Sequence, residues 1–325
     1  MKNLLKTITL LVILGIGLFV TASCKKNNDL PAKDALDLAL ADSRLSTFAK
    51  LLADNGLLET LKSAESSTIF APTNEAFQKA DLSQLTKSEL LKLLNTHIVR
   101  KNRLLVNEMK SGVVRSPNVE IFLSKNSSGV FINGHSKVTS PDILAATNVI
   151  HVIDKVIFPA TKSIMDIIKS NPNFSELNSW ISVAGNNLEA NLGVPNVFGS
   201  TIFAPTNAAF EELYKTTPKA TLLADNGMLN EILRFQRIGG RIFSTDFPNI
   251  TQPINMSNTP ITITPLGNSP GVTVTNLFNG QYQLVLDLTN GTKIRGISSG
   301  VANVTSTNLF ATNGVIHAID KVLLP

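Results

Sequence analysis

Cysteine and the large polar aromatic residues are scarce in this chain. The sequence has 325 residues, with a single cysteine at position 24, one tryptophan and two tyrosines. A lone cysteine excludes an intrachain disulfide. With so few polar aromatic rings, the chain has little with which to stack on sugar rings.

Motifs that bind phosphates or metals are also missing from the sequence. It contains no glycine-rich loop of the Walker or dinucleotide-binding type. The four histidines form neither an H-x-x-x-H pattern nor a cluster with carboxylates. We therefore expect no cofactor and no metal site.

The charge of the chain gives no sign of a nucleic-acid partner. The formal net charge is +5 at pH 7, and the basic residues are scattered among acidic ones instead of being clustered. A nucleic-acid-binding surface needs a basic patch or stripe. We expect no nucleic-acid partner.

The only long apolar run lies at the amino terminus. Lys2 and Lys6 precede an apolar stretch over residues 8–20, and small residues then lead to Cys24. The run is shorter than the roughly 20 residues of a membrane span, and its layout is typical of a secretory signal. The position of Cys24 resembles the lipid-attachment site of a bacterial lipoprotein, although Thr21 stands where such signals usually have leucine. An ordinary cleaved signal and an uncleaved anchor are the alternatives.

The lipoprotein interpretation predicts where the protein is found. It assigns residues 1–23 to the signal peptide and residues 24–32 to a tether. Two or more acyl chains, such as palmitate, give stable anchoring at about 0.8 kcal/mol for each buried methylene. The protein is then held on a membrane through Cys24, in the bacterial cell envelope, at the outer membrane or the cell surface.

The main feature that is present is an internal duplication. The string S-T-I-F-A-P-T-N-E-A-F begins at Ser67 and returns with one change at Ser200. A second block, I-H-x-I-D-K-V, begins at Ile150 and again at Ile316. The two copies predict two domains, residues 33–160 and 161–325, with the seam near residues 160–162.

Each copy begins with helical patterns and ends with strand patterns. In the first copy, apolar spacing over residues 35–52 predicts a helix, Thr86 to Glu89 reads as a capping box, and Asn133-Gly134 is a hairpin signal. Alternating residues around 119–138 and the block 150–157 read as strands. Helices followed by strands in one unit predict an α+β fold.

The order of the two blocks resembles the fasciclin-like domain at both of its signature segments. The resemblance implies two tandem domains, each a helical layer packed on a mostly antiparallel β-wedge. It also implies an adhesion or binding function in place of catalysis, with a protein, matrix or glycan ligand.

The closing blocks contain matched residues to which we assign structural roles. Histidine and aspartate recur at the same places in both copies, and a feature that the fold requires should appear in every copy. Asn148 and Gly314 also match, and both residue types tolerate a left-handed backbone. The predicted structural residues are Asn148, His151, Asp154, Gly314, His317 and Asp320.

Two surfaces are candidates for partner binding. In animal relatives of the fasciclin-like family, an Asp-Ile pair ahead of the last block is associated with integrin contact, which carries over to Asp142 and Ile143. The second copy has Asn308 and Leu309 there, so it lacks the acid. The second candidate is the longer middle of the second copy, where β-patterned residues at 261–264, 272–275 and 284–288 enlarge the domain.

The other function classes have weaker support in the sequence. Residues 296–300 match G-x-S-x-G, but His317 and Asp320 follow in the wrong order for a hydrolase, so we expect no enzyme. The alternative to adhesion is a glycan- or polymer-binding accessory lipoprotein of a nutrient-uptake system. It would need exposed aromatic rings, with Trp180 and Tyr282 as the first candidates.

Replacing the only cysteine tests the lipid anchor. We expect Cys24→Ala to move the protein from the membrane fraction to the soluble fraction, because no acyl chain can then be attached. Fractionation followed by immunoblotting measures the distribution. Full retention of the variant with the membranes would contradict lipid attachment as the main tether.

Overall fold

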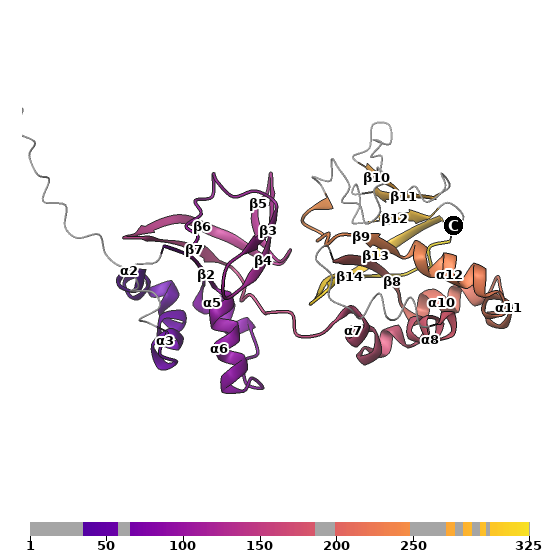
Figure 1. Ribbon diagram of the computed structural model, residues 1–325, viewed down its shortest axis with the longest axis horizontal. Coiled ribbons are helices and arrows are strands. Elements are labelled where there is room, and N and C mark those ends of the chain that lie inside the picture. Colours follow the sequence, from indigo (N-terminus) through magenta and orange to yellow (C-terminus); the bar gives the residue numbers. More distant parts are fainter. Residues whose placement is uncertain are drawn as a thin grey trace, which may run out of the picture. The chain divides into compact units, whose positions relative to one another are not determined.

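The computed structural model describes residues 35–57, 66–185, 199–247, 271–276, 282–287, 293–296 and 300–324 (Figure 1). The predicted signal peptide and tether, with Cys24, lie outside these residues. No helix in the described ranges is long and apolar enough to cross a membrane.

The first copy runs from helices into strands. Its helical elements are α2 (Ala35–Ala41), a 3-10 turn η1 (Ser43–Leu45), α3 (Ser46–Asp54), α5 (Asn74–Lys79) and α6 (Lys87–Thr96). Its strands are β1 (Ser67–Pro72), β2 (Ile98–Arg100), β3 (Gly112–Arg115), β4 (Glu120–Asn126), β5 (Gly129–Ile132), β6 (Ser136–Ala145) and β7 (Asn148–Ile153). The α+β fold class is confirmed.

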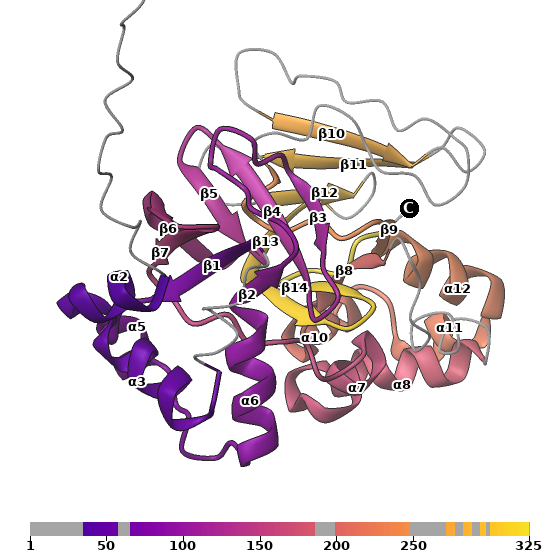
Figure 2. The ribbon, with the colours of Figure 1, turned by 60° about the vertical axis from the view of Figure 1, so that its left-hand side comes forward.

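The second copy repeats this order. Its helical elements are α7 (Ile164–Ser170), a 3-10 turn η2 (Pro172–Phe174), α8 (Ser175–Ala184), α10 (Asn207–Tyr214), α11 (Lys219–Ala224) and α12 (Asn226–Phe235). Its strands are β8 (Ser200–Pro205), β9 (Arg237–Gly239), β10 (Gly271–Asn276), β11 (Tyr282–Asp287), β12 (Lys293–Gly296), β13 (Gly300–Ala311) and β14 (Gly314–Ile319). In Figure 2, β10, β11 and β12 follow one another beside β13.

Both copies have the same sheet topology. The described strands form two seven-stranded sheets, in the orders β2-β1-β7-β6-β5-β4-β3 and β10-β11-β12-β13-β14-β8-β9. One pair in each sheet is parallel, β1 with β7 and β8 with β14, and the other pairs are antiparallel. The two strands of each parallel pair are the first and the last strand of their copy. Their pairing therefore brings the two ends of the copy together.

The repeated string T-I-F-A-P is buried on both faces of its strand. In β1, Ile69 and Ala71 pack with the helices, whereas Phe70 packs on the opposite face with Val99 and Ile121. Every residue of β1, β7, β8 and β14 is buried. Parallel strands covered on both faces need apolar residues at successive positions, not at alternate ones.

Most of the predicted local structures are confirmed. Thr86 and Glu89 form the capping box that begins α6. Gly56, after α3, has φ 70°, and the hairpin turn between β5 and β6 has Asn133 at φ 50° and Gly134 at φ 65°. The closing strand is shorter than the predicted 150–157 and ends at Ile153, because its parallel partner β1 ends at Pro72.

The prediction of a left-handed backbone at Asn148 and Gly314 is wrong. Neither residue has a positive φ, although Asp142 and Asn308 do, at 58° and 59°. The glycine serves a different purpose, since a Cβ on Gly314 would collide with the carbonyl oxygen of Ser200 on the parallel strand β8. The glycine at this position of the repeat is therefore explained by the close approach of β14 to β8 in the second copy.

The asparagine of the A-P-T-N segment attaches the opening helical elements to the helix that follows the first strand, α5 in the first copy and α10 in the second. The Asn74 side chain accepts a hydrogen bond from Thr47 N–H (2.9 Å) and donates one to Ser43 O (2.8 Å). Asn207 makes the matching bonds with Glu176 N–H (3.0 Å) and Pro172 O (2.9 Å). A side chain with both a donor and an acceptor is needed for this arrangement, which accounts for asparagine in both copies.

Removing this side chain should destabilise the domain to which it belongs. We expect Asn74→Ala to lower the free energy of unfolding by about 1–3 kcal/mol, because two backbone groups lose their partner. Urea denaturation measures the change. Asn173→Ala removes an exposed side chain and should change stability by less than about 0.5 kcal/mol; equal effects of the two substitutions would contradict the assigned role.

Candidate functional site

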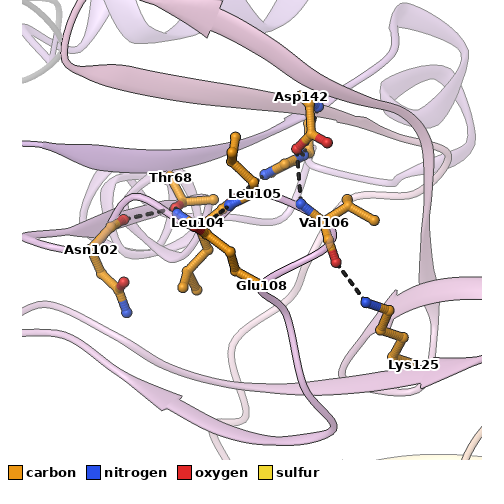
Figure 3. A network of polar contacts seen from close by, with 9 residues as sticks. Thr68, Asn102, Leu104, Leu105, Val106, Glu108, Lys125 and Asp142 are labelled. Atoms are coloured by element: carbon orange, nitrogen blue, oxygen red, sulfur yellow. Dashed lines mark hydrogen bonds and ion pairs between the residues drawn. The ribbon is translucent and has the colours of Figure 1, made fainter.

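A loop of residues 104–109 in the first copy lies against β1 and β6, and buried polar groups hold it there. The Thr68 hydroxyl donates to Asn102 O (2.7 Å) and accepts from Leu104 N–H (2.9 Å). Figure 3 shows this threonine on one side of the loop and Asp142 on the other. The loop is thus fixed at its start by the repeated string itself.

His151, on β7, also binds the backbone of this loop. Its Nε2–H donates to Leu104 O (2.8 Å), and its Nδ1 accepts from Asp142 N–H (3.2 Å). Burial lowers the pKa of His151, an effect that the bonds to Leu104 and the charge of Asp142 oppose. The neutral ring satisfies two backbone groups and has no nitrogen left for a substrate or a metal.

Asp142 completes the attachment of the loop. It lies at an irregularity in the pairing of β6 with β7, between Ser140 and Ile143. Its Oδ1 accepts from Val106 N–H (2.9 Å), while its side chain remains 39% exposed. Lys125 adds a bond from its Nζ to Val106 O (2.8 Å; Figure 3).

Of the predicted partner-binding pair Asp142 and Ile143, only Asp142 has its side chain at the surface. Ile143 packs against the helical core, so its side chain faces inward. The next residue, Leu144, is 59% exposed. Sequence reasoning missed Leu144, although side chains alternate along a strand and an inward Ile143 implies an outward neighbour.

The second copy contains the same loop, residues 242–247, with the same attachments. The Thr201 hydroxyl donates to Gly240 O and accepts from Ile242 N–H, each at 2.8 Å. His317 donates to Ile242 O (2.9 Å) and accepts from Asn308 N–H (3.4 Å). The Asn308 Oδ1 accepts from Ser244 N–H (2.8 Å), as Asp142 does from Val106.

The amide of Asn308 provides a donor that Asp142 lacks. Its Nδ2 donates to Gly134 O in the first copy (2.7 Å). In return, the Nδ2 of Asn126, also in the first copy, donates to Thr245 O (2.8 Å). The second copy is therefore bonded to the first at two points, one in this loop and one on β13.

Aromatic rings fill the centre of this contact. Phe243 and Phe310 of the second copy lie with their ring centroids 5.9 Å from that of Phe122 in the first copy. Gly134 permits the approach, since a Cβ there would stand 2.5 Å from the Cβ of Phe243. By their place in the repeat, Leu105 and Leu144 are the first-copy counterparts of Phe243 and Phe310.

We call the residues 104–109 and 142–144 of the first copy the docking loop. In the second copy the equivalent residues form a protein contact. In the first copy they leave Leu144 exposed beside the partly exposed carboxylate of Asp142. This arrangement of an apolar side chain beside a carboxylate can bind a protein surface.

His97 and Gln236 perform one structural task with different side chains. His97 donates from Nδ1 to Leu93 O (2.8 Å) and accepts at Nε2 from Ile157 N–H (3.0 Å). Gln236 donates to Ile232 O (2.8 Å) and accepts from Leu323 N–H (3.2 Å). The sequence shows no similarity at this position because the shared feature is the geometry of a donor and an acceptor.

Asp154 and Asp320 join strands in the two copies. Each carboxylate accepts a backbone N–H from the start of the preceding long strand, Lys137 N–H for Asp154 and Asn303 N–H for Asp320, both at 2.7 Å. Asn148 begins β7 as a buried residue. All of these matched residues therefore lie in the framework that positions the loops.

The remaining sequence-based candidates fall into two groups. Trp180 is fully buried and donates to Tyr214 Oη (2.8 Å), so it cannot stack on a sugar as the glycan-binding alternative required. Ser298, the turns of the enlarged β-region and the side chain of Tyr282 lie outside the described residues. Within the described ranges, no group of three or more histidine, cysteine or carboxylate side chains could hold a metal ion.

The comparison with family models decides the identity of the fold. The model of the fasciclin domain matches residues 43–159 and again residues 172–325. This chain belongs to the fasciclin family. The match covers both copies of the internal repeat.

Relatives of known name are similar over most of the chain. Human periostin is 28% identical over 293 residues, which cover 89% of this chain and 31% of periostin. Fasciclin-1 of Drosophila melanogaster is 27% identical over 312 residues, 91% of this chain and 45% of that protein. The chain thus spans between about a third and a half of these fasciclin proteins.

A solved structure of a fasciclin domain pair, from the insect cell adhesion molecule fasciclin I, also matches. It covers 87% of this chain and 97% of the solved chain, at 20% identity and a TM-score of 0.38.

Acid should destabilise the first fasciclin domain through His97. Burial lowers the pKa of His97 to about 4, below its ordinary value of 6.5. Between these values the unfolded chain binds a proton that the folded chain does not, so stability is complete above pH 6.5 and falls towards pH 4, by up to about 1.4 kcal/mol per pH unit.

The variant His97→Gln copies Gln236 of the second domain and should fold while losing this part of the pH dependence. Urea denaturation at pH 7, 6, 5 and 4 measures it. An unchanged pH profile in the variant would show that other groups cause the acid sensitivity. His317 should cause the same loss of stability at low pH in the second domain, because burial lowers its pKa to about 4 as well.

Proposed function

We propose that the protein is a lipid-anchored component of the bacterial cell envelope that mediates adhesion or protein and matrix interactions through its two fasciclin domains. The lipid on Cys24 holds it at the outer membrane or the cell surface. The protein is not an enzyme. The docking loop of the first domain is its contact surface.

The observation that carries this proposal is the use of the equivalent loop in the second domain. There, Phe243, Phe310 and Asn308 bind the first domain through ring contacts and a hydrogen bond to backbone. A surface that serves as a protein contact in one copy supports the same use in the other. The first domain offers it with Leu144 exposed as an apolar anchor.

Asp142, unlike Asn308, is available to bind an external partner. The Asn308 amide satisfies a carbonyl of its own chain. Asp142 instead presents a carboxylate that is only partly used by Val106 N–H. A partner with a basic or N–H donor group next to an apolar pocket would match this pair of groups.

The framework residues support the absence of catalysis. Both ring nitrogens of His151 and of His317 are bonded to backbone groups. The carboxylates of Asp154 and Asp320 accept backbone N–H groups. A general base needs a free basic atom within reach of a substrate, and the two histidine rings have none.

A charged substitution in the docking loop tests the proposal. We expect Leu144→Lys to reduce the adhesion of cells that display the protein by at least about tenfold, because an interface loses its apolar anchor and must bury a charge. Adhesion is measured on surfaces coated with collagen, with fibronectin or with the purified protein.

Val113→Lys is the matched control. Val113 is 38% exposed on the edge strand β3 of the same domain, outside the docking loop. Its substitution should leave adhesion unchanged. Equal loss in both variants, or no adhesion of the natural protein to any of the coated surfaces, would contradict the proposed function.

A further inference from the structure

A cleft of about 630 Å³ opens where the second domain meets the first. Its walls come from α6 and β4 of the first domain, from the link at Pro159 and Ala160, and from Arg241, Phe310 and Thr312 of the second domain. This volume lies within the range of small-molecule sites. None of the docking-loop residues lines it.

Arg241 is held rigidly in the wall of this cleft. Its guanidinium lies over the ring of Phe122 at 4.8 Å, and its Nη2 donates to Thr312 O (2.7 Å). Its side chain passes directly over Gly199, where a Cβ would meet the Arg241 Cγ at 2.6 Å. Three separate contacts thus fix the orientation of the group before any ligand arrives.

The charge of Arg241 has no partner of opposite sign in the described part of the chain. The nearby carboxylate of Glu120 forms its ion pair with Arg115 (2.7 Å). Burial lowers the pKa of Arg241; among the nearby charges, Glu120 opposes this effect and Arg115 adds to it. A partly buried cation is normally paired, so this group favours an anion in the cleft.

The same wall holds hydrogen-bond donors without acceptors. Asn133 is 6% exposed, and its Oδ1 accepts from Phe122 N–H (2.9 Å), but its Nδ2 has no partner. The Nε of Arg241 is likewise buried without one. Buried donors usually have an acceptor, so these two atoms would gain one from a ligand oxygen that reached them.

We propose that this cleft binds a small sugar acid, with Arg241 as the group that receives its carboxylate. The planar guanidinium matches a carboxylate in a bidentate arrangement. The hydroxyl of Ser88 and the amide of Asn95 suit the sugar hydroxyls, and Leu91 and Val119 suit the apolar faces of the ring. This site is separate from the docking loop, and neither proposal depends on the other.

Binding of a defined acidic sugar tests the inference. Isothermal titration of the purified full chain with a glucuronate-containing disaccharide should show binding, whereas neutral cellobiose should not bind. Arg241→Gln should weaken binding by at least about tenfold, since it removes a charge-assisted pair. Arg103→Gln, which changes an exposed arginine of the first domain that does not line the cleft, should leave the affinity within about twofold.

Two measurements keep the outcome interpretable. Thermal melting checks that Arg241→Gln is folded, and Arg241→Lys, which keeps the charge but loses the planar fork, should bind with intermediate affinity. Gly199→Ala should also weaken binding by displacing the side chain of Arg241. Equal binding of the acidic and neutral sugars, unchanged affinity in Arg241→Gln, or no heat of binding for the natural chain would overturn the proposal.

Discussion

The parallel pairing of the first and last strands of each domain is the constraint from which the rest of the structure follows. These strands, β1 with β7 and β8 with β14, are buried on both faces. Any polar group in or beside them must find its partner inside the protein. The hydroxyl of Thr68 and the ring of His151 meet this requirement by binding the backbone of the loop that starts at Leu104. A requirement of the core thus fixes a segment at the surface.

Duplication preserved this inner arrangement and allowed the outer one to change. The hydroxyl, the histidine and the strand-joining aspartate are the same in both domains, because each binds backbone atoms in the same place. The residue at the irregularity of the long strand differs. Asp142 provides only acceptors, whereas Asn308 adds a donor that binds Gly134 O. A change from a carboxylate to an amide therefore accompanies the change from an exposed loop to a contact between domains.

The contact between domains has a second consequence. Phe122, which receives the rings of Phe243 and Phe310, also carries the guanidinium of Arg241 on its surface. Packing and charge are thus combined at one strand of the first domain. The cleft exists only in the assembled pair, since its walls come from both domains.

Much of this organisation follows from the sequence alone. The repeat, the α+β class, the capping box at Thr86 and the turn at Asn133-Gly134 are local or periodic features, and local chemistry determines them. The expectation at Asn148 and Gly314 failed because residue type suggested a backbone angle, while the actual constraint is the closeness of Ser200 on a neighbouring strand.

Only the tertiary structure decided the roles at the surface. It placed Ile143 inward and Leu144 outward, buried Trp180, and gave His97 and Gln236 the same task. It also brought Arg241 to Phe122, from another domain. These outcomes depend on which atoms lie within a few ångströms after folding, and a linear sequence does not specify those distances.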